Sequence, residues 1–86
     1  MDYGIFDHLD QGRDDLTALF EDRLRLTEAY DQAGFYAYHL AEHHATPLGM
    51  APSPGIFLAA AAARTTNNKL GALVYILPAY SPLRLI

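Results

Sequence analysis

The stretch GFYAYHLAEHHATP, residues 34–47, decides between two different folds. It places His39, Glu42 and His43 at the H-x-x-E-H spacing of inverted zinc peptidases. On a helix, residues four apart share one face and could bind one zinc ion. On a strand, four residues span about 13 Å, too far for two imidazoles to share a metal. The glycine that opens the stretch and the proline that closes it leave little room for a helix, so the sequence favours a strand.

The strand interpretation sorts the side chains of this stretch onto two faces. His39, Ala41 and His43 point one way, while Leu40, Glu42 and His44 point the other. The polar residues come last, at the carboxyl end of the strand, where parallel α/β proteins bind ligands. From the residues alone, a loop-lining role for the two adjacent histidines is equally plausible. A zinc-dependent hydrolase built on the H-x-x-E-H residues stays open as an alternative.

The segments around this strand alternate between helix and strand signals. Asp14 and Asp15 suit the start of a helix, and Gly34 supplies the left-handed residue that commonly ends one. Ser53 and Pro54 predict a second helix, with a hydroxyl cap and proline at its first position. The expected strands are residues 3–6, 36–42 and 70–77, and the expected helices are residues 14–33 and 54–66. This β-α-β-α-β order predicts a parallel sheet with right-handed crossovers.

The last residues indicate that the fold continues. The apolar run LGALVYIL, residues 70–77, reads as a strand buried on both faces. Ser81 and Pro82 then begin a third helix that has barely one turn before Ile86, and such a helix is unstable alone. We therefore expect residues 1–86 to be one segment from the front of a longer protein.

Composition excludes several classes of function. The chain has 86 residues, a net charge of −4 and no cysteine. The negative charge argues against a nucleic-acid groove, and the absence of cysteine excludes disulfides and thiolate metal sites. No stretch is apolar for long enough to span a bilayer, and the N-terminus has no signal-peptide pattern. We expect a cytoplasmic protein that binds neither nucleic acid nor membrane.

Three ordered stretches, GFYAYHLAEHH, SPGIFLAAAAARTTNNKLGALVYILP and SPLRLI, resemble the bacterial luciferase-like monooxygenase family. The resemblance covers most of the chain. The chain departs from the family at Gly71-Ala72, where Gly-Thr is common. It also has fewer basic residues before the third strand than is usual in the family. The family fold is a TIM-like (β/α)8 barrel, which takes about 250 residues. The resemblance therefore implies that this chain is the N-terminal third of such a barrel, incomplete and inactive alone.

The resemblance also implies a chemistry and partners. Family members hold a reduced flavin, FMN or in some cases a deazaflavin, at the carboxyl mouth of the barrel. Most use O2 to oxidise a small organic substrate such as an aldehyde, ketone or sulfonate. The resemblance further implies a separate flavin reductase and a homodimer formed through the alanine-rich helix at residues 59–63.

Residue roles follow from the same resemblance. His43 would lie beside the flavin as the catalytic acid or base, since an imidazole titrates near neutrality. Glu42 would orient the site or approach the flavin. The bond between Leu73 and Val74 matches a non-proline cis peptide that the family places under the ring. His8 and His44 are weaker candidates that would border the substrate pocket.

One further hypothesis needs no catalysis at all. A sheet with open edges and a helix rich in alanine could serve a non-enzymatic accessory fragment that pairs with another chain.

Overall fold

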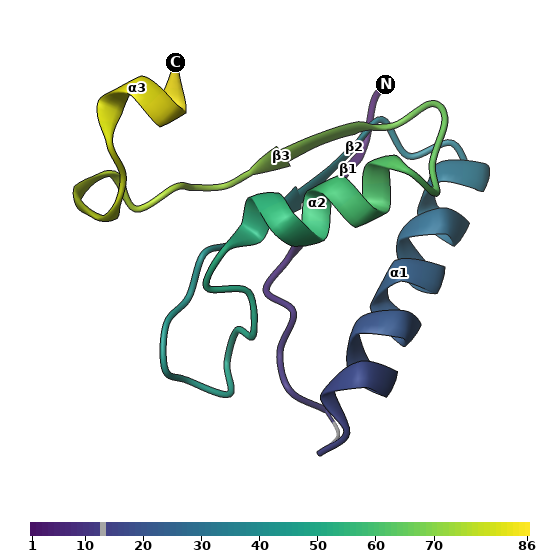
Figure 1. The fold of residues 1–86 in the computed structure, drawn as a ribbon. Coiled ribbons are helices and arrows are strands. Elements are labelled where there is room, and N and C mark those ends of the chain that lie inside the picture. Colours follow the sequence, from purple (N-terminus) through teal and green to yellow (C-terminus); the bar gives the residue numbers. More distant parts are fainter. Residues whose placement is uncertain (13) are drawn as a thin grey trace.

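The computed structural model describes residues 1–12 and 14–86. Three strands alternate with helices in the predicted order, which confirms the β-α-β-α-β interpretation (Figure 1). The elements are β1 (Gly4–Asp7), α1 (Leu16–Gln32), β2 (Ala37–Leu40), α2 (Pro54–Ala62), β3 (Lys69–Ala72), the 3-10 turn η1 (Leu77–Ala79) and α3 (Pro82–Leu85).

The three strands form a parallel sheet in the order β1-β2-β3. In its register, Phe6 lies opposite His39, and His39 lies opposite Gly71. Ladder contacts continue beyond the strand ends, since the amide of Leu73 donates to the carbonyl of Leu40 at 2.9 Å. All three strands therefore end at the same edge of the sheet, and β2 holds the other two in place.

One face of the sheet packs against α1 and α2 (Figure 1). Tyr38 and Leu40 on β2 are fully buried there, against Phe57, Leu58 and Ala61 of α2. Burying such side chains contributes about 1.5–3 kcal/mol each, so this layer stabilises the sheet. The alternate positions face the other way, where Phe6 is 51% exposed. In the barrel that the sequence resemblance implies, this second face would line the interior.

The ends of α1 are built as its sequence predicts. The carboxylate of Asp15 accepts from the amide of Ala18, and Gly34 follows the helix with φ +89°. The amide of Phe35 then donates to the carbonyl of Tyr30 at 3.1 Å, and their rings meet edge to face. The chain is thereby turned back into β2.

A carboxylate at the end of α1 holds the connection between α2 and β3. Asp31 is buried and accepts from the backbone amides of Thr66, Asn67 and Asn68 at 2.7–2.9 Å. These amides lower the pKa of Asp31 below its ordinary value. The sequence offered no periodic signal for this contact, which joins residues 35–37 positions apart.

The structure corrects three expectations from the sequence. The third strand ends at Ala72, and its apolar continuation is exposed because no second neighbouring strand pairs with β3 among the described residues. The second helix ends at Ala62, four residues early, because the chain turns where Asp31 holds it. Ser53 makes no side-chain hydrogen bond to the first turn of α2, although Pro54 occupies the expected position.

The chain after β3 leaves the sheet. It passes through η1 into α3, which projects away from the two longer helices (Figure 1). The start of α3 at Pro82 is as predicted. In the described part of the chain, no helix combines the length and hydrophobicity needed to cross a membrane.

A part-buried ion pair joins the end of β1 to α1. The carboxylate of Asp7 accepts from Arg23 and Tyr38, and its side chain also accepts from the amide of Leu9 at 3.0 Å. Burial favours the neutral acid, but these hydrogen bonds outweigh it and lower the pKa of Asp7. The ionised form is therefore the stable form in the folded protein.

We predict that Asp7→Asn lowers the free energy of unfolding by about 2–3 kcal/mol at neutral pH, the usual contribution of hydrogen bonds to a charged group. A carboxyl group whose pKa is lowered by folding stabilises the fold at pH values above its ordinary pKa of 3.8. That stability is lost as the pH falls through the lowered pKa. Urea unfolding from pH 7 to pH 3 should thus show a shallower decline for Asp7→Asn. Parallel curves for the two proteins would contradict this role.

Candidate active site

Three connections meet at the carboxyl edge of the sheet (Figure 1). His8 follows β1, the Glu42-His43-His44 run follows β2, and Leu73 and Val74 follow β3. Parallel pairing brings these segments together, although they are more than 60 positions apart in the chain. In parallel α/β folds this edge is where ligands bind.

The imidazoles of His8 and His43 lie next to each other. Their ring centroids are 5.5 Å apart in an edge-to-face arrangement, and His8 also contacts the ring of Phe6. A hollow of about 360 Å³ opens beside them, lined by His8, Asp10, His43 and Leu48. His43 is half-buried and lines this hollow, so its imidazole is within reach of a molecule there.

Gly49 allows the loop after β2 to fold back closely against His43 and against the backbone of His8. A Cβ at this position would lie 2.7 Å from Cβ and Cγ of His43 and 2.9 Å from the carbonyl oxygen of His8. The amide of Met50 also donates to the carbonyl of Leu9 at 2.8 Å, which binds this connection to the one after β1. The His43 ring can therefore keep this position only because residue 49 is a glycine and has no side chain.

Glu42 points away from His43, as the alternation of the strand predicts. Its side chain is fully buried, and Oε2 lies 2.7 Å from Nε2 of His44. Oε1 accepts from the hydroxyl of Tyr80 at 2.6 Å and from the amide of Ile76 at 3.2 Å. Burial favours the neutral acid, yet these hydrogen bonds outweigh it and lower the pKa of Glu42.

Tyr80 is a partner that sequence reasoning missed. Its hydrogen bond to Glu42, together with burial, raises the pKa of Tyr80 to about 12, so the hydroxyl remains a donor at neutral pH. The two residues are 38 positions apart, and no motif links them. The single available signal was the aromatic residue within LPAYSP, which is not specific.

The remaining candidates are divided between the two sides of the edge. His44 pairs with Glu42 and does not line the hollow beside His8 and His43. Leu73 and Val74 are 44% and 60% exposed. The peptide bond between them is cis, and this confirms the geometry expected for that bond.

The zinc hypothesis finds no support in this geometry. His39 lies within β2, and no helix forms over residues 39–43. Across residues 1–12 and 14–86, no group of three or more histidine, cysteine, aspartate or glutamate side chains is placed to hold a metal ion. The imidazole of His39 instead lies over Gly71, where an added Cβ would be in ordinary contact with the ring at 3.5 Å.

This parallel sheet with its carboxyl-edge histidines is matched by a known family over its whole length. The family model for luciferase-like monooxygenases matches residues 1–86, and the chain belongs to that family. The resemblance seen in the sequence is therefore confirmed.

Three relatives show how far the similarity extends. The uncharacterised protein y4wF of Sinorhizobium fredii is 52% identical over 82 residues, which cover 95% of this chain and 24% of y4wF. The oxygenase component of the flavin-dependent trigonelline monooxygenase of Acinetobacter baylyi is 29% identical, covering 99% of this chain and 24% of that protein. The oxygenating constituent of 3,6-diketocamphane monooxygenase from Pseudomonas putida, a type II Baeyer-Villiger monooxygenase solved with FMN, has a TM-score of 0.87 at 26% identity.

The solved structure also fixes the extent of the fold. The match covers 99% of this chain and 24% of the solved chain, so the β-α-β-α-β unit is part of a TIM-like barrel. The chain spans about a quarter of the length of the relatives that it matches.

We predict that Gly49→Ala displaces the His43 ring, because the added methyl group would overlap both histidine segments. The imidazole proton resonances of His43 and His8 should shift together in NMR spectra, and the protein should be destabilised by about 1–3 kcal/mol. Gly12→Ala is the matched control, since no described residue other than its chain neighbours lies within 4 Å of a Cβ there. Unchanged histidine resonances in Gly49→Ala would show that the contact is not tight.

Proposed function

We propose that this chain supplies part of the active site of a flavin-dependent monooxygenase, which uses reduced FMN and O2 to oxidise a small organic substrate. The observation that carries the proposal is the half-buried His43, packed against His8 at the carboxyl edge of the family's sheet. Membership of the luciferase-like monooxygenase family supports the same reaction class.

The residues at this edge fit a flavin ring in their chemistry. A flavin ring is planar and largely apolar, and the edge exposes Phe6, Leu73 and Val74 to contact it. His43 adds a group that can donate or accept a hydrogen bond at the ring or the substrate. The family holds the flavin phosphate on later strands, so this chain would contribute the ring side of the site.

Each polar residue then has a distinct proposed role. The flavin would supply the chemistry with O2, while His43 holds or moves a proton within the hollow. His8 would border the substrate and support the His43 ring. Glu42 would orient the site from behind, with His44 as its partner.

The names of the relatives guide the choice of cofactor and partner. The trigonelline enzyme is described as flavin-dependent, and the diketocamphane enzyme was solved with FMN, which favours FMN over a deazaflavin. The trigonelline protein is also described as an oxygenase component. By analogy, we propose that a separate reductase supplies the reduced flavin.

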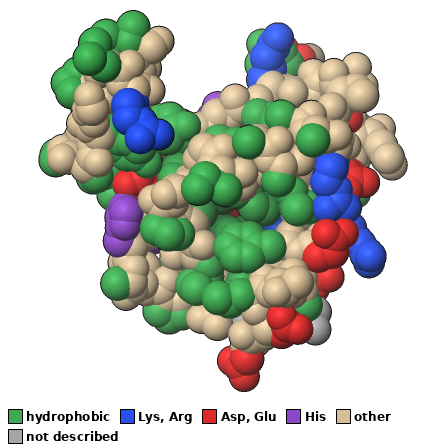
Figure 2. All heavy atoms as spheres, viewed as in Figure 1, with side chains coloured by type: hydrophobic (Ala, Val, Ile, Leu, Met, Phe, Trp, Pro, Cys, Tyr) green, Lys and Arg blue, Asp and Glu red, His purple; other side chains and the backbone are tan. Residues whose placement is uncertain are grey.

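The outer surface of α2 offers a place for a second copy. Ile56 is 75% exposed on this helix, and the neighbouring alanines 59 and 60 are exposed as well. Figure 2 shows hydrophobic side chains gathered over α2, whereas charged side chains gather along α1. We propose that the whole protein forms a homodimer through α2.

The decisive experiment is a titration with reduced FMN. The whole protein should bind it in the micromolar range or tighter, and residues 1–86 alone should not, because in this proposal later strands hold the flavin phosphate. Tight binding by a monodisperse sample of residues 1–86 would refute the division of the site. Failure of the whole protein to bind any flavin would favour the accessory hypothesis.

We predict that His43→Ala lowers turnover at least about 100-fold in the whole protein, the usual effect of losing an acid or base group. Oxygen consumption with reduced FMN and a panel of small ketones and aldehydes would measure it. His39→Ala is the matched control: it removes an imidazole from β2, the strand that leads to His43, and its effect should fall on stability. Equal loss of turnover in both variants would contradict the role of His43.

A further inference from the structure

We propose that Tyr80 is a positioning residue, which holds the segment after β3 at the flavin-binding edge through the carboxylate of Glu42. This inference rests on the proposed function, because the edge that it positions is the proposed ring side of the flavin site. Nothing in the family resemblance pointed to Tyr80.

The segment that carries Leu73 and Val74 is held at one end by the last residue of β2 and at the other by the chain that follows it. At one end, the amide of Leu73 donates to the carbonyl of Leu40 at 2.9 Å. At the other end, the amide of Ile76 donates to Oε1 of Glu42 at 3.2 Å. The intervening residues therefore have a fixed place relative to His43, which is the next residue after Glu42.

Tyr80 strengthens the second of these two attachments. Its hydroxyl donates to the same Oε1 at 2.6 Å, the shorter of the two contacts to that oxygen. The turn η1 connects them, since the amides of Ala79 and Tyr80 donate to the carbonyls of Ile76 and Leu77. Residues 76–80 thus form a compact loop that closes on one carboxylate oxygen.

Among the described residues, Oε1 of Glu42 accepts two hydrogen bonds, from the Tyr80 hydroxyl and the Ile76 amide. The Glu42 side chain has no exposed surface, and its other oxygen is engaged by His44. Without the Tyr80 hydroxyl, Oε1 would keep only the longer contact to the Ile76 amide. A buried carboxylate that loses a hydrogen bond becomes costly to keep ionised, so the loop would shift to satisfy it.

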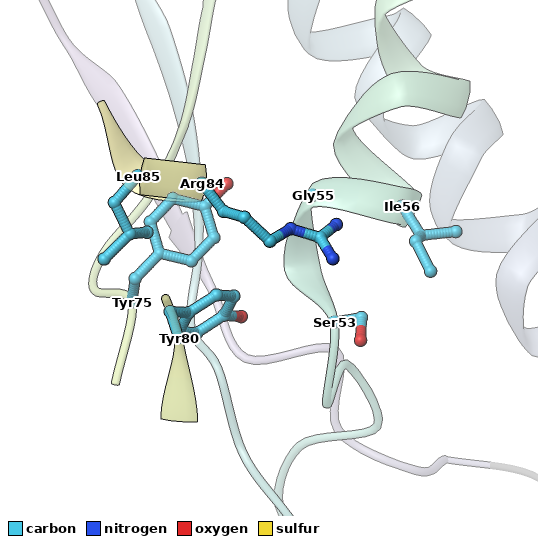
Figure 3. Close-up of a pocket in the computed structure, with 7 residues that line it drawn as sticks. All are labelled: Ser53, Gly55, Ile56, Tyr75, Tyr80, Arg84 and Leu85. Carbon is cyan, nitrogen blue, oxygen red and sulfur yellow. The ribbon is translucent and has the colours of Figure 1, made fainter. Parts of the chain in front are cut away.

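The tyrosine itself lies away from the proposed reaction. Figure 3 shows Tyr80 beside Tyr75, below α3 and across from the first turn of α2, and the two rings are 5.2 Å apart. It is not among the residues that line the hollow at His8 and His43. Its influence on a bound flavin would therefore be indirect, through the placement of residues 73–76.

The test is Tyr80→Phe in the whole protein, which keeps the ring and removes the hydroxyl. We expect the Kd for reduced FMN to rise about tenfold, the equivalent of one hydrogen bond. The visible absorbance spectrum of bound oxidised FMN should shift, because the backbone beside the ring moves. Tyr36→Phe is the matched control, since that ring is 51% exposed at the opposite edge of the sheet.

Further variants show whether Tyr80 acts through Glu42. Glu42→Gln keeps an acceptor oxygen and should retain most of the affinity, whereas Glu42→Ala should lose at least as much as Tyr80→Phe. Combining Glu42→Ala with Tyr80→Phe should add no further loss, because the two remove the same contact. Full additivity of the two changes would overturn the proposal.

Two other outcomes are equally clear. If Tyr80→Phe binds reduced FMN with unchanged Kd and spectrum, the positioning role is refuted, even when thermal stability has fallen. If the unmodified whole protein binds no flavin, the proposed function fails and the positioning role fails with it. The first result leaves the monooxygenase proposal intact, so the two failures are distinguishable.

Discussion

The hydrogen bonding of β2 to both of its neighbours is the constraint on which the rest of the structure depends. Because the pairing is parallel on both sides, the ends of all three strands fall at one edge. One face of the strand fills the core with Tyr38 and Leu40. The chain that continues from this strand places Glu42 and His43 on opposite sides of the edge. Both the core packing and the arrangement of the candidate site therefore follow from the way successive side chains of an extended chain point to opposite faces.

The fold was predictable where a local signal determined the backbone. Gly34 ends α1 with a positive φ, and the short space before the next proline forces a strand. The prediction was wrong where hydrophobicity alone was used, at residues 73–77. An apolar run reads the same whether its residues are paired in a sheet or exposed beyond an edge, because pairing depends on a neighbouring strand.

The candidate site was predictable only in part. The position of His8 and His43 at one edge follows from strand order, which the sequence reveals. The partners of Glu42 do not, since Ile76 and Tyr80 reach it through a turn whose path no periodicity encodes. The role of Gly49 could not be predicted either, because it matters only through the close approach of His43 and His8 to residue 49. Contacts between loops depend on tertiary placement, and the local pattern carries no information about it.

The carboxylate of Asp31 has a consequence for how this protein can vary over evolution. It recognises three successive backbone amides, at Thr66, Asn67 and Asn68, and every amino acid except proline supplies that group. The three amide contacts thus place no demand on the side chains of this connection, although the Thr66 hydroxyl adds one contact to Asp31 at 3.3 Å. The acidic residue 35 positions earlier is required for all of them. A conserved aspartate facing a variable loop would be the mark of this arrangement in an alignment of related chains.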